Sequence, residues 1–229
     1  MRIYSDVFEM HAEEKRNLIE MGTVVHPPTM QDKHVSHDPG FATLELSPCV
    51  FTVLSGDRRL EWLESLGKHV DWAVTDFQER ISPHGINPGD AWQMRPEWAE
   101  FLHDGKFAYT YSERFAAALL PVIRQLDENH DTRQAVLPVF NPSLDIQHLG
   151  GVKRVPCSMY YQFLRRRGEL DCFYAMRSSD FHTHFPYDIF LAMELQAHIA
   201  SVIHSPVGRF TFFSGSLHLY RKDSTEVVF

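Results

Sequence analysis

The sequence has few cysteines, no long apolar run and no excess of positive charge. Its three cysteines, Cys49, Cys157 and Cys172, form no C-x-x-C pair, which favours a reducing compartment and argues against disulfides or structural zinc. The fourteen histidines are scattered without an H-E-x-x-H spacing, so no metal is expected. No stretch is long and apolar enough to cross a bilayer, and the first residues lack a secretory core. We therefore expect a cytoplasmic protein without a membrane partner.

The charge balance indicates which kinds of partner the chain can bind. The chain carries 22 Lys and Arg against 30 Asp and Glu, a net charge of −8. Such a surface argues against a general nucleic-acid binder, but it leaves room for a small anionic ligand held by a few arginines. The 229 residues are 44% hydrophobic and 13% aromatic, enough to bury one large core. We expect a single domain over residues 1–229.

The periodicity of apolar residues indicates mixed helices and strands. It predicts helices over 10–21, 60–81, 92–102, 115–126 and 188–203, and an irregular exposed loop over 22–40. Strands are expected over 41–54, 135–140, 158–164, 170–176 and 209–214, with a hairpin turn at Arg167-Gly168 joining two of them. Hairpins without regular βαβ alternation favour an α+β fold.

The most informative stretch is 155–220. Cys157 follows Pro156 at the start of a predicted strand, and a lone cysteine of this kind is usually a small buried hydrophobe. Three further motifs follow in order, at 177–180 (RSSD), 186–188 (PYD) and 215–220 (GSLHLY). A thiolate is the form that attacks carbon, and a guanidinium favours it, so an arginine near Cys157 suits a nucleophile.

This order of motifs resembles the thymidylate synthase superfamily, most strongly over about 105–223. Family members carry Pro-Cys-x-x-x-x-Gln-Phe, Arg-Ser-x-Asp, Pro-Phe-Asn and Gly-Asp-x-His-x-Tyr, which match 156–163, 177–180, 186–188 and 215–220 here. Residues 131–134 (DTRQ) resemble the family's Asp-x-Arg-Arg, and 109–114 (YTYSER) resemble its Tyr-Gly-x-x-x-Arg segment. The resemblance implies a mixed sheet packed by helices and a homodimer formed across that sheet.

The resemblance also implies roles for individual residues. Cys157 would add to C6 of a pyrimidine nucleoside monophosphate, making C5 nucleophilic toward a one-carbon unit from 5,10-methylenetetrahydrofolate. The 5′-phosphate would be held by arginine forks and a hydroxyl, with one arginine crossing the dimer interface. The remaining residues would hold the sugar and the base. The phosphate set is Arg177, Ser178 and the interface-crossing Arg133; the sugar set is His218 and Tyr220; the base set is Asp180 and Gln162.

Asp188 departs from the synthase pattern, which has asparagine there. Asparagine donates to uracil O4 and accepts from N3–H, whereas cytosine presents an amino donor and an N3 acceptor. A carboxyl group at Asp188 therefore favours cytidylate, and the exchange resembles the cytidylate hydroxymethylases. The alternative is an aspartate placed near a helix start for capping, whatever the ligand.

Other departures concern the phosphate, the proton relay and the chain end. Gln134 replaces a phosphate arginine and Ser216 an aspartate, so Lys33, Arg114 or Arg154 are candidates to assist. The catalytic glutamate is first sought at Glu79, then at Glu64 and Asp76, each of which is alternatively a solvated helix-face charge. The chain ends nine residues after Tyr220. We expect no long closing tail and hence entry of water, unless another segment, such as the N-terminal half, closes the site.

The sequence thus predicts a folate-dependent 5-hydroxymethylase of CMP or dCMP. Two alternatives stay open: a thymidylate synthase that converts dUMP to dTMP, and a catalytically silent nucleotide-binding homologue.

Overall fold

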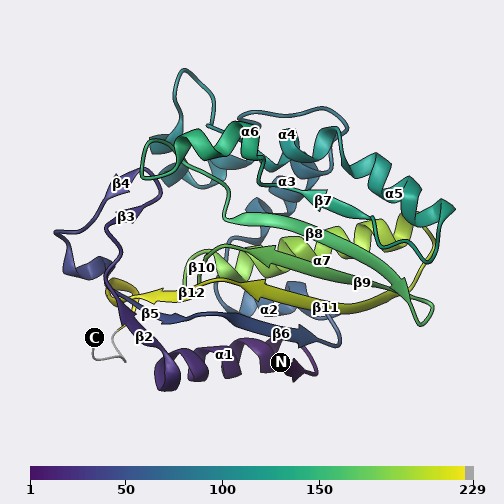
Figure 1. Cartoon of the computed structure of the whole chain (residues 1–229), viewed down its shortest axis with the longest axis horizontal. Coiled ribbons are helices and arrows are strands. Elements are labelled where there is room, and N and C mark those ends of the chain that lie inside the picture. The colour runs from purple at the N-terminus through teal and green to yellow at the C-terminus, as the bar shows by residue number, and fades with distance from the viewer. Residues whose placement is uncertain (225–229) are drawn as a thin grey trace.

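The computed structural model describes residues 1–224 and has the expected α+β architecture, with a central six-stranded mixed sheet (Figure 1). The pairs β1–β6 and β11–β9 are parallel, and the other neighbours are antiparallel. The strand hairpin β8–β9 turns at Arg167-Gly168 as predicted. The strands, in spatial order, are β1 (Arg2–Tyr4), β6 (Cys49–Val53), β11 (Val207–Ser214), β9 (Glu169–Met176), β8 (Ser158–Arg166) and β7 (Val136–Pro138).

A second sheet takes its strands from segments far apart in the chain. Its order is β10 (Ser179–Asp180), β12 (Leu217–Tyr220), β5 (Thr43–Leu46) and β2 (Thr23–Val25). The single strand predicted over 41–54 is wrong, because Pro48 has no backbone N–H to continue the ladder and the chain passes there from β5 into β6 of the other sheet. The predicted loop 22–40 also holds β2 and a small hairpin, β3 (Thr29–Met30) with β4 (Lys33–His34).

The helices pack around the central sheet, and three of their predicted spans are wrong. The span 115–126 is interrupted at residues 117–118, between the helices Tyr111–Ala116 and Leu119–Glu128. The span 60–81 is divided where Gly67 adopts a φ of +64°, which ends one helix and frees the next to start in a new direction. The span 92–102 forms two 3₁₀ segments, Ala91–Met94 and Pro96–Phe101, separated ahead of Pro96. The α-helices are α1 (Val7–Met21), α2 (Arg59–Ser65), α3 (Val70–Arg80), α4 (Tyr111–Ala116), α5 (Leu119–Glu128), α6 (Pro142–Asp145) and α7 (Phe185–Val202). Shorter 3₁₀ turns lie at Pro39–Phe41, Ile146–His148 and Arg221–Asp223.

Helix α7 covers the inner face of the central sheet and is buried along most of its length. Its Gln196 Nε2 donates to the carbonyls of Leu170, Gly208 and Arg209 at 2.8, 3.2 and 3.1 Å, which ties the helix to β9 and β11. The rings beneath it, including Phe51, Phe212, Tyr174 and Tyr161, are fully buried. The outer face of the sheet carries the alternate residues, which are more exposed.

Candidate active site

A cavity of about 680 Å³ opens between two walls of different character. The strand wall comes from the strand ends and the start of α7, and the helical wall from α3 to α4. Eight of the ten site residues predicted from the sequence line this cavity. The strand wall comprises Cys157, Arg177, Ser178, Ser179, Asp180, Asp188, His218 and Tyr220, and the helical wall Trp72, Asp76, Glu79, Arg80, Trp92, Arg95, Trp98, Phe101, Tyr109 and Tyr111.

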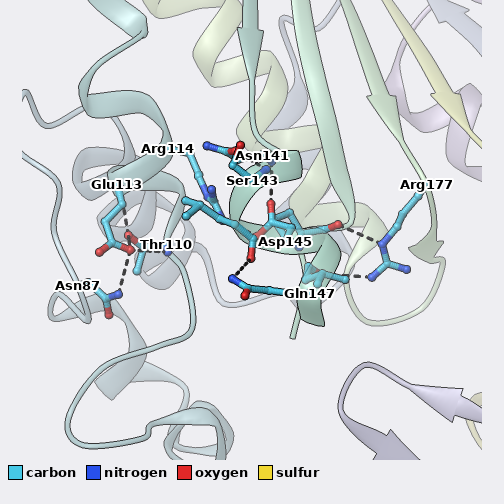
Figure 2. A network of polar contacts seen from close by, with 12 residues as sticks. Asn87, Thr110, Glu113, Arg114, Asn141, Ser143, Asp145, Gln147 and Arg177 are labelled. Carbon is cyan, nitrogen blue, oxygen red and sulfur yellow. Dashed lines mark hydrogen bonds and ion pairs between the residues drawn. The ribbon is translucent and has the colours of Figure 1, made fainter. Parts of the chain in front are cut away.

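Cys157 lies half-buried just ahead of β8. Its Sγ is 3.7 Å from Ser178 Oγ. The Arg177 guanidinium donates to the carbonyls of Pro156 (3.0 Å) and Val155 (3.3 Å), contacts drawn beside Arg177 in Figure 2. The Arg177 backbone N–H also donates to the Cys157 carbonyl at 2.8 Å. Arg177 Nη1 also donates to Ser178 Oγ at 3.3 Å. Arg177 therefore fixes the loop that carries the thiol, mainly through hydrogen bonds to the backbone of that loop.

Asp188 lies in the first turn of α7, where its half-buried side chain lines the cavity. It caps nothing: the N-cap is His184, and Asp188 Oδ2 accepts from Ser179 Oγ at 2.8 Å. Within residues 1–224, Oδ1 has no hydrogen-bond partner. Burial raises the pKa of Asp188 to about 7, against the opposing effects of the Ser179 hydrogen bond and the Arg80 charge. Near neutral pH this carboxyl can therefore both donate and accept.

His218 and Tyr220 stand next to each other on β12, with ring centroids 5.1 Å apart. Burial lowers the pKa of His218 and raises the pKa of Tyr220. Both side chains are therefore neutral at physiological pH, as suits hydrogen bonds to a sugar hydroxyl. Across the sheet from His218 lies Glu45, which lines the cavity and accepts a hydrogen bond from Ser216 Oγ. Sequence reasoning missed Glu45, although it puts a carboxylate beside the serine that replaces the family's aspartate.

Asp180 sits at the end of β10, paired in register with His218. Its Oδ1 accepts the backbone N–H groups of His182 (3.0 Å) and Thr183 (3.2 Å). The carboxylate thus shapes the turn that leads into α7 while lining the cavity.

Two of the three proton-relay candidates line the cavity. Glu79 Oε1 accepts the backbone N–H groups of Asp90 and Ala91, the latter at 2.9 Å. Asp76 Oδ2 accepts from Arg80 Nε at 2.6 Å. Glu64 is exposed and does not line the cavity. Because Asp76 is paired to a buried arginine, Glu79 stays the preferred candidate.

A buried polar chain behind the helical wall was not foreseen from the sequence. The Arg80 guanidinium lies 3.8 Å from the centroid of the Tyr111 ring. Tyr111 Oη is 2.7 Å from Ser158 Oγ, which in turn contacts Tyr174 Oη. The chain links the helical wall to the first residue of β8, next to Cys157. Its only sequence signal was the match at 109–114.

Two guanidinium groups stack on aromatic rings of the helical wall. Arg95 lies 4.7 Å from the Trp72 centroid, and Arg154 lies 4.8 Å from Trp98 and 4.1 Å from Phe101. Among the described residues, Arg95 Nη1, Arg154 Nε and Trp98 Nε1 are buried without a hydrogen-bond partner. Flat cationic and aromatic surfaces with unused donors suit a planar ligand that carries acceptors, such as a reduced folate.

Arg133 and Gln162 are the two predicted residues that do not line the cavity. Gln162 Nε2 donates to the Arg133 carbonyl at 3.0 Å. Gln162 pairs with Phe173 across β8–β9, on the outer face of the sheet. Both residues therefore lie away from their own chain's cavity.

Of the three cations considered for the phosphate, only Arg154 lines the cavity. Lys33 pairs with Glu100 at 2.8 Å. Arg114 donates to Asp145 Oδ1 at 2.6 Å, and Asp145 Oδ2 accepts the Asn141 N–H at 2.7 Å, a network shown in Figure 2. That buried ion pair joins α4 to α6. Arg114 therefore has a structural role and does not face the cavity.

The remaining expectations concern a metal and the chain end. Across residues 1–224 no group of acidic, histidine and cysteine side chains could hold a metal ion, and no helix of that part is long and apolar enough to span a membrane. The expectation that no long closing tail covers the site falls partly on residues 225–229, which lie outside the described residues.

Comparison with known proteins agrees with this geometry. A family model described as thymidylate synthase matches residues 47–228. A bifunctional dihydrofolate reductase-thymidylate synthase of Glycine max is 28% identical over 173 residues, 73% of this chain and 32% of that protein. A putative thymidylate synthase of Methanosarcina barkeri is 28% identical over 64% of this chain and 69% of its own length. The chain thus spans about a third of the bifunctional relatives.

Solved structures show the same fold. Thymidylate synthase A of Bacillus subtilis superposes with a TM-score of 0.73 at 16% identity, covering 94% of this chain and 80% of that one. The thymidylate synthase of phage T4 gives a TM-score of 0.67 at 17% identity, covering 93% and 76%. At such identities the likeness concerns the fold alone.

Proposed function

Because this chain belongs to the thymidylate synthase family, we propose that it transfers a one-carbon unit to C5 of a pyrimidine nucleoside monophosphate. The substrate we favour is CMP or dCMP, and the product its 5-hydroxymethyl derivative. The family's co-substrate, 5,10-methylenetetrahydrofolate, would supply the one-carbon unit when bound against the stacked surfaces of Trp98 and Arg154.

Residues of both walls support this chemistry. The Cys157 thiolate would form a bond to C6, which places electron density on C5. Glu79 would move the C5 proton through water, and His218 with Tyr220 would hold the sugar. C5 would then bond to the methylene carbon of the folate, and loss of the C5 proton would let tetrahydrofolate leave from that carbon, giving an exocyclic methylene. Water would add to this methylene to give the hydroxymethyl group, and departure of the Cys157 sulfur from C6 would restore the C5–C6 double bond and regenerate the thiolate.

The observation that carries the choice of cytosine is the carboxyl of Asp188, whose pKa is raised to about 7. In its neutral form it can accept from the cytosine amino group and donate to N3. In its ionised form it still accepts from the amino group. The Asp-for-Asn exchange at this position is also the pattern of the cytidylate hydroxymethylases.

Conversion of dUMP to dTMP is the second candidate, and the same carboxyl favours it at low pH. A neutral carboxyl can donate to uracil O4 and accept from N3–H, as asparagine does. The ionised form repels O4. Selectivity for cytosine over uracil should therefore rise as pH increases through about 7, the pKa of Asp188.

The test is an incubation with methylenetetrahydrofolate and each of CMP, dCMP and dUMP at several pH values around 7, with products identified by mass. We expect hydroxymethylated cytidylate and tetrahydrofolate, with selectivity rising with pH. Asp188→Asn is the matched variant and should shift preference to uridylate. Formation of dTMP and dihydrofolate from dUMP alone would support the second candidate. No tritium release from C5-labelled nucleotides would identify a silent homologue.

We also propose a homodimer built on the outer face of the central sheet. That face carries half-exposed residues such as Phe173 and Thr211, and Tyr160 and Val136 are more exposed still. Arg133 lies at its edge, as a residue that crosses to a partner would. Mixing Cys157→Ala and Arg133→Ala subunits should restore activity that neither variant shows alone, because one hybrid site keeps both residues. A monomer by sedimentation would overturn this proposal.

A further inference from the structure

The turn of the hairpin β3–β4 holds a residue in an unusual backbone conformation. Gln31 has a φ of +56° at the first turn position between Met30 and Lys33. Glycine is the usual residue where a tight hairpin turn needs positive φ at this position. A non-glycine residue with positive φ is uncommon and costs free energy. Strained residues of this kind are often found at functional sites. The glutamine side chain should therefore do something that glycine cannot.

The side chain of Gln31 contacts the nucleophile. Its Nε2 lies 3.4 Å from Cys157 Sγ, and its Oε1 accepts the Val155 backbone N–H at 3.3 Å. The second contact fixes the orientation of the amide. Since a backbone N–H can only donate, the amide oxygen must face Val155, and the NH₂ group must then face the sulfur.

The hairpin is held over the cavity by contacts on its other residues. Lys33 Nζ pairs with Glu100 at 2.8 Å and lies 5.2 Å from the Phe101 centroid, on the helical wall. Pro27, Thr29, Met30 and Gln31 all line the cavity. In Figure 1 the hairpin stands apart from the two larger sheets, at the end of the molecule where β10 and β12 lie. The position of Gln31 is thus set by both walls.

We propose that Gln31 is a positioning residue for the Cys157 nucleophile, an inference that rests on the proposed function. Its amide N–H donates to the sulfur, and a hydrogen bond to a charged acceptor is stronger than one to a neutral acceptor. The contact therefore favours the thiolate and fixes the direction of its lone pairs. The other titratable or charged groups near the sulfur are Arg177, Arg154, Tyr109 and Tyr220, and all remain in the variants below.

The test is the rate of alkylation of the thiol by iodoacetamide as a function of pH, with no nucleotide or folate present. Cys49 and Cys172 are 0% and 1% exposed, so the reactive thiol of the folded chain is Cys157, and Cys157→Ala provides the blank. Gln31→Gly deletes the amide and suits the backbone of the turn. We expect it to raise the midpoint of the pH profile by about one unit, a tenfold loss of thiolate below the midpoint.

Two further variants keep the proposal falsifiable. Gln31→Glu puts a carboxylate against the sulfur in the same shape and should raise the midpoint more than glycine does. Gln31→Ala should match Gln31→Gly in midpoint if the turn tolerates it. An unchanged midpoint with only a faster plateau would mean that Gln31 merely shields the thiol, and would overturn the proposal. Because no substrate is used, this outcome is independent of which nucleotide reacts.

Discussion

The strand wall and the helical wall enclose one cavity but are built in different ways. The strand wall presents short polar groups at the ends of strands and the start of α7, each fixed by backbone pairing, such as Asp180 opposite His218. The helical wall presents large rings and guanidinium groups that hold one another, such as Arg80 on Tyr111. The comparison suggests a division of labour. Changes in the strand wall should cost catalysis with little loss of stability, and changes in the helical wall should cost stability first.

The largest effect is expected from Cys157→Ala in the strand wall. Loss of a covalent nucleophile should lower kcat by about 10⁴-fold or more, equivalent to about 5 kcal/mol. The midpoint of urea unfolding should stay nearly unchanged, because the residue is only half-buried. Cys172→Ala is the matched control, a buried cysteine outside the cavity, which should keep turnover and lose about 1 kcal/mol of stability. Equal turnover in both variants would end the assignment of Cys157.

The next effect is expected from Arg80→Met in the helical wall. The change leaves Asp76 without its partner 2.6 Å away, and breaking a largely buried pair from one side costs about 3 kcal/mol. The measurement is the free energy of unfolding in urea. Arg58→Met, which breaks the exposed pair with Glu61, should leave the midpoint of unfolding where it is. If both variants unfold alike, the helical wall does not carry the stability assigned to it.

Asp188 belongs to the strand wall but feels the charges of Arg80 and Asp76 in the helical wall, and its contribution to stability should depend on pH. Burial raises its pKa to about 7 in the folded chain, above its value of about 4 when unfolded. The folded state therefore binds more protons in this window, so the free energy of unfolding falls as pH rises from about 4 to 7. Relative to Asp188→Asn, the unmodified chain should lose about 2 kcal/mol between about pH 5 and 7. If the difference in free energy of unfolding between the two proteins does not vary with pH, the Asp188 carboxyl is solvated and its pKa is not raised by burial.

The smallest effect is expected from Tyr111→Phe, which removes one hydroxyl from the chain through Ser158 to Tyr174. Ser158 keeps its contact with Tyr174, so the loss should be about 1 kcal/mol in the free energy of unfolding. Tyr109→Phe is the control, since the Tyr109 hydroxyl has no hydrogen-bond partner within residues 1–224. We expect it to be closer to neutral, and a larger loss for Tyr109 would reverse the ranking.

The two walls also differ in how far the sequence predicts them. Cys157, Arg177, Asp188 and His218 could be placed because they belong to short motifs with fixed spacing. Arg80 could not be placed, because its ring contact is with Tyr111, thirty-one positions away in the sequence. Nothing in the local sequence distinguishes Arg80 from a solvated helix residue. Gln31 lay in a stretch predicted to be irregular.

The secondary structure shows the same limit. The hairpin β8–β9 and helix α7 were predicted from local turn chemistry and apolar periodicity. The span 41–54 reads as one strand by alternation, yet β5 and β6 belong to different sheets. The span 60–81 has one continuous apolar stripe, yet it forms two helices separated at Gly67. Pro48 and Gly67 mark the two breaks, but the apolar pattern continues on both sides of them, so periodicity alone does not find them.

The place of β11 in the central sheet has a consequence for how the chain is made. This strand, formed by residues near the end of the described chain, lies between β6 and β9 and is the only link between them in the sheet of residues 1–224. During synthesis, the β1–β6 pair and the β7–β8–β9 group must wait with open edges until residue 214 has emerged. Open edges of this kind invite pairing with other chains. A nascent chain paused before β11 should therefore be the species most prone to aggregate and most in need of a chaperone.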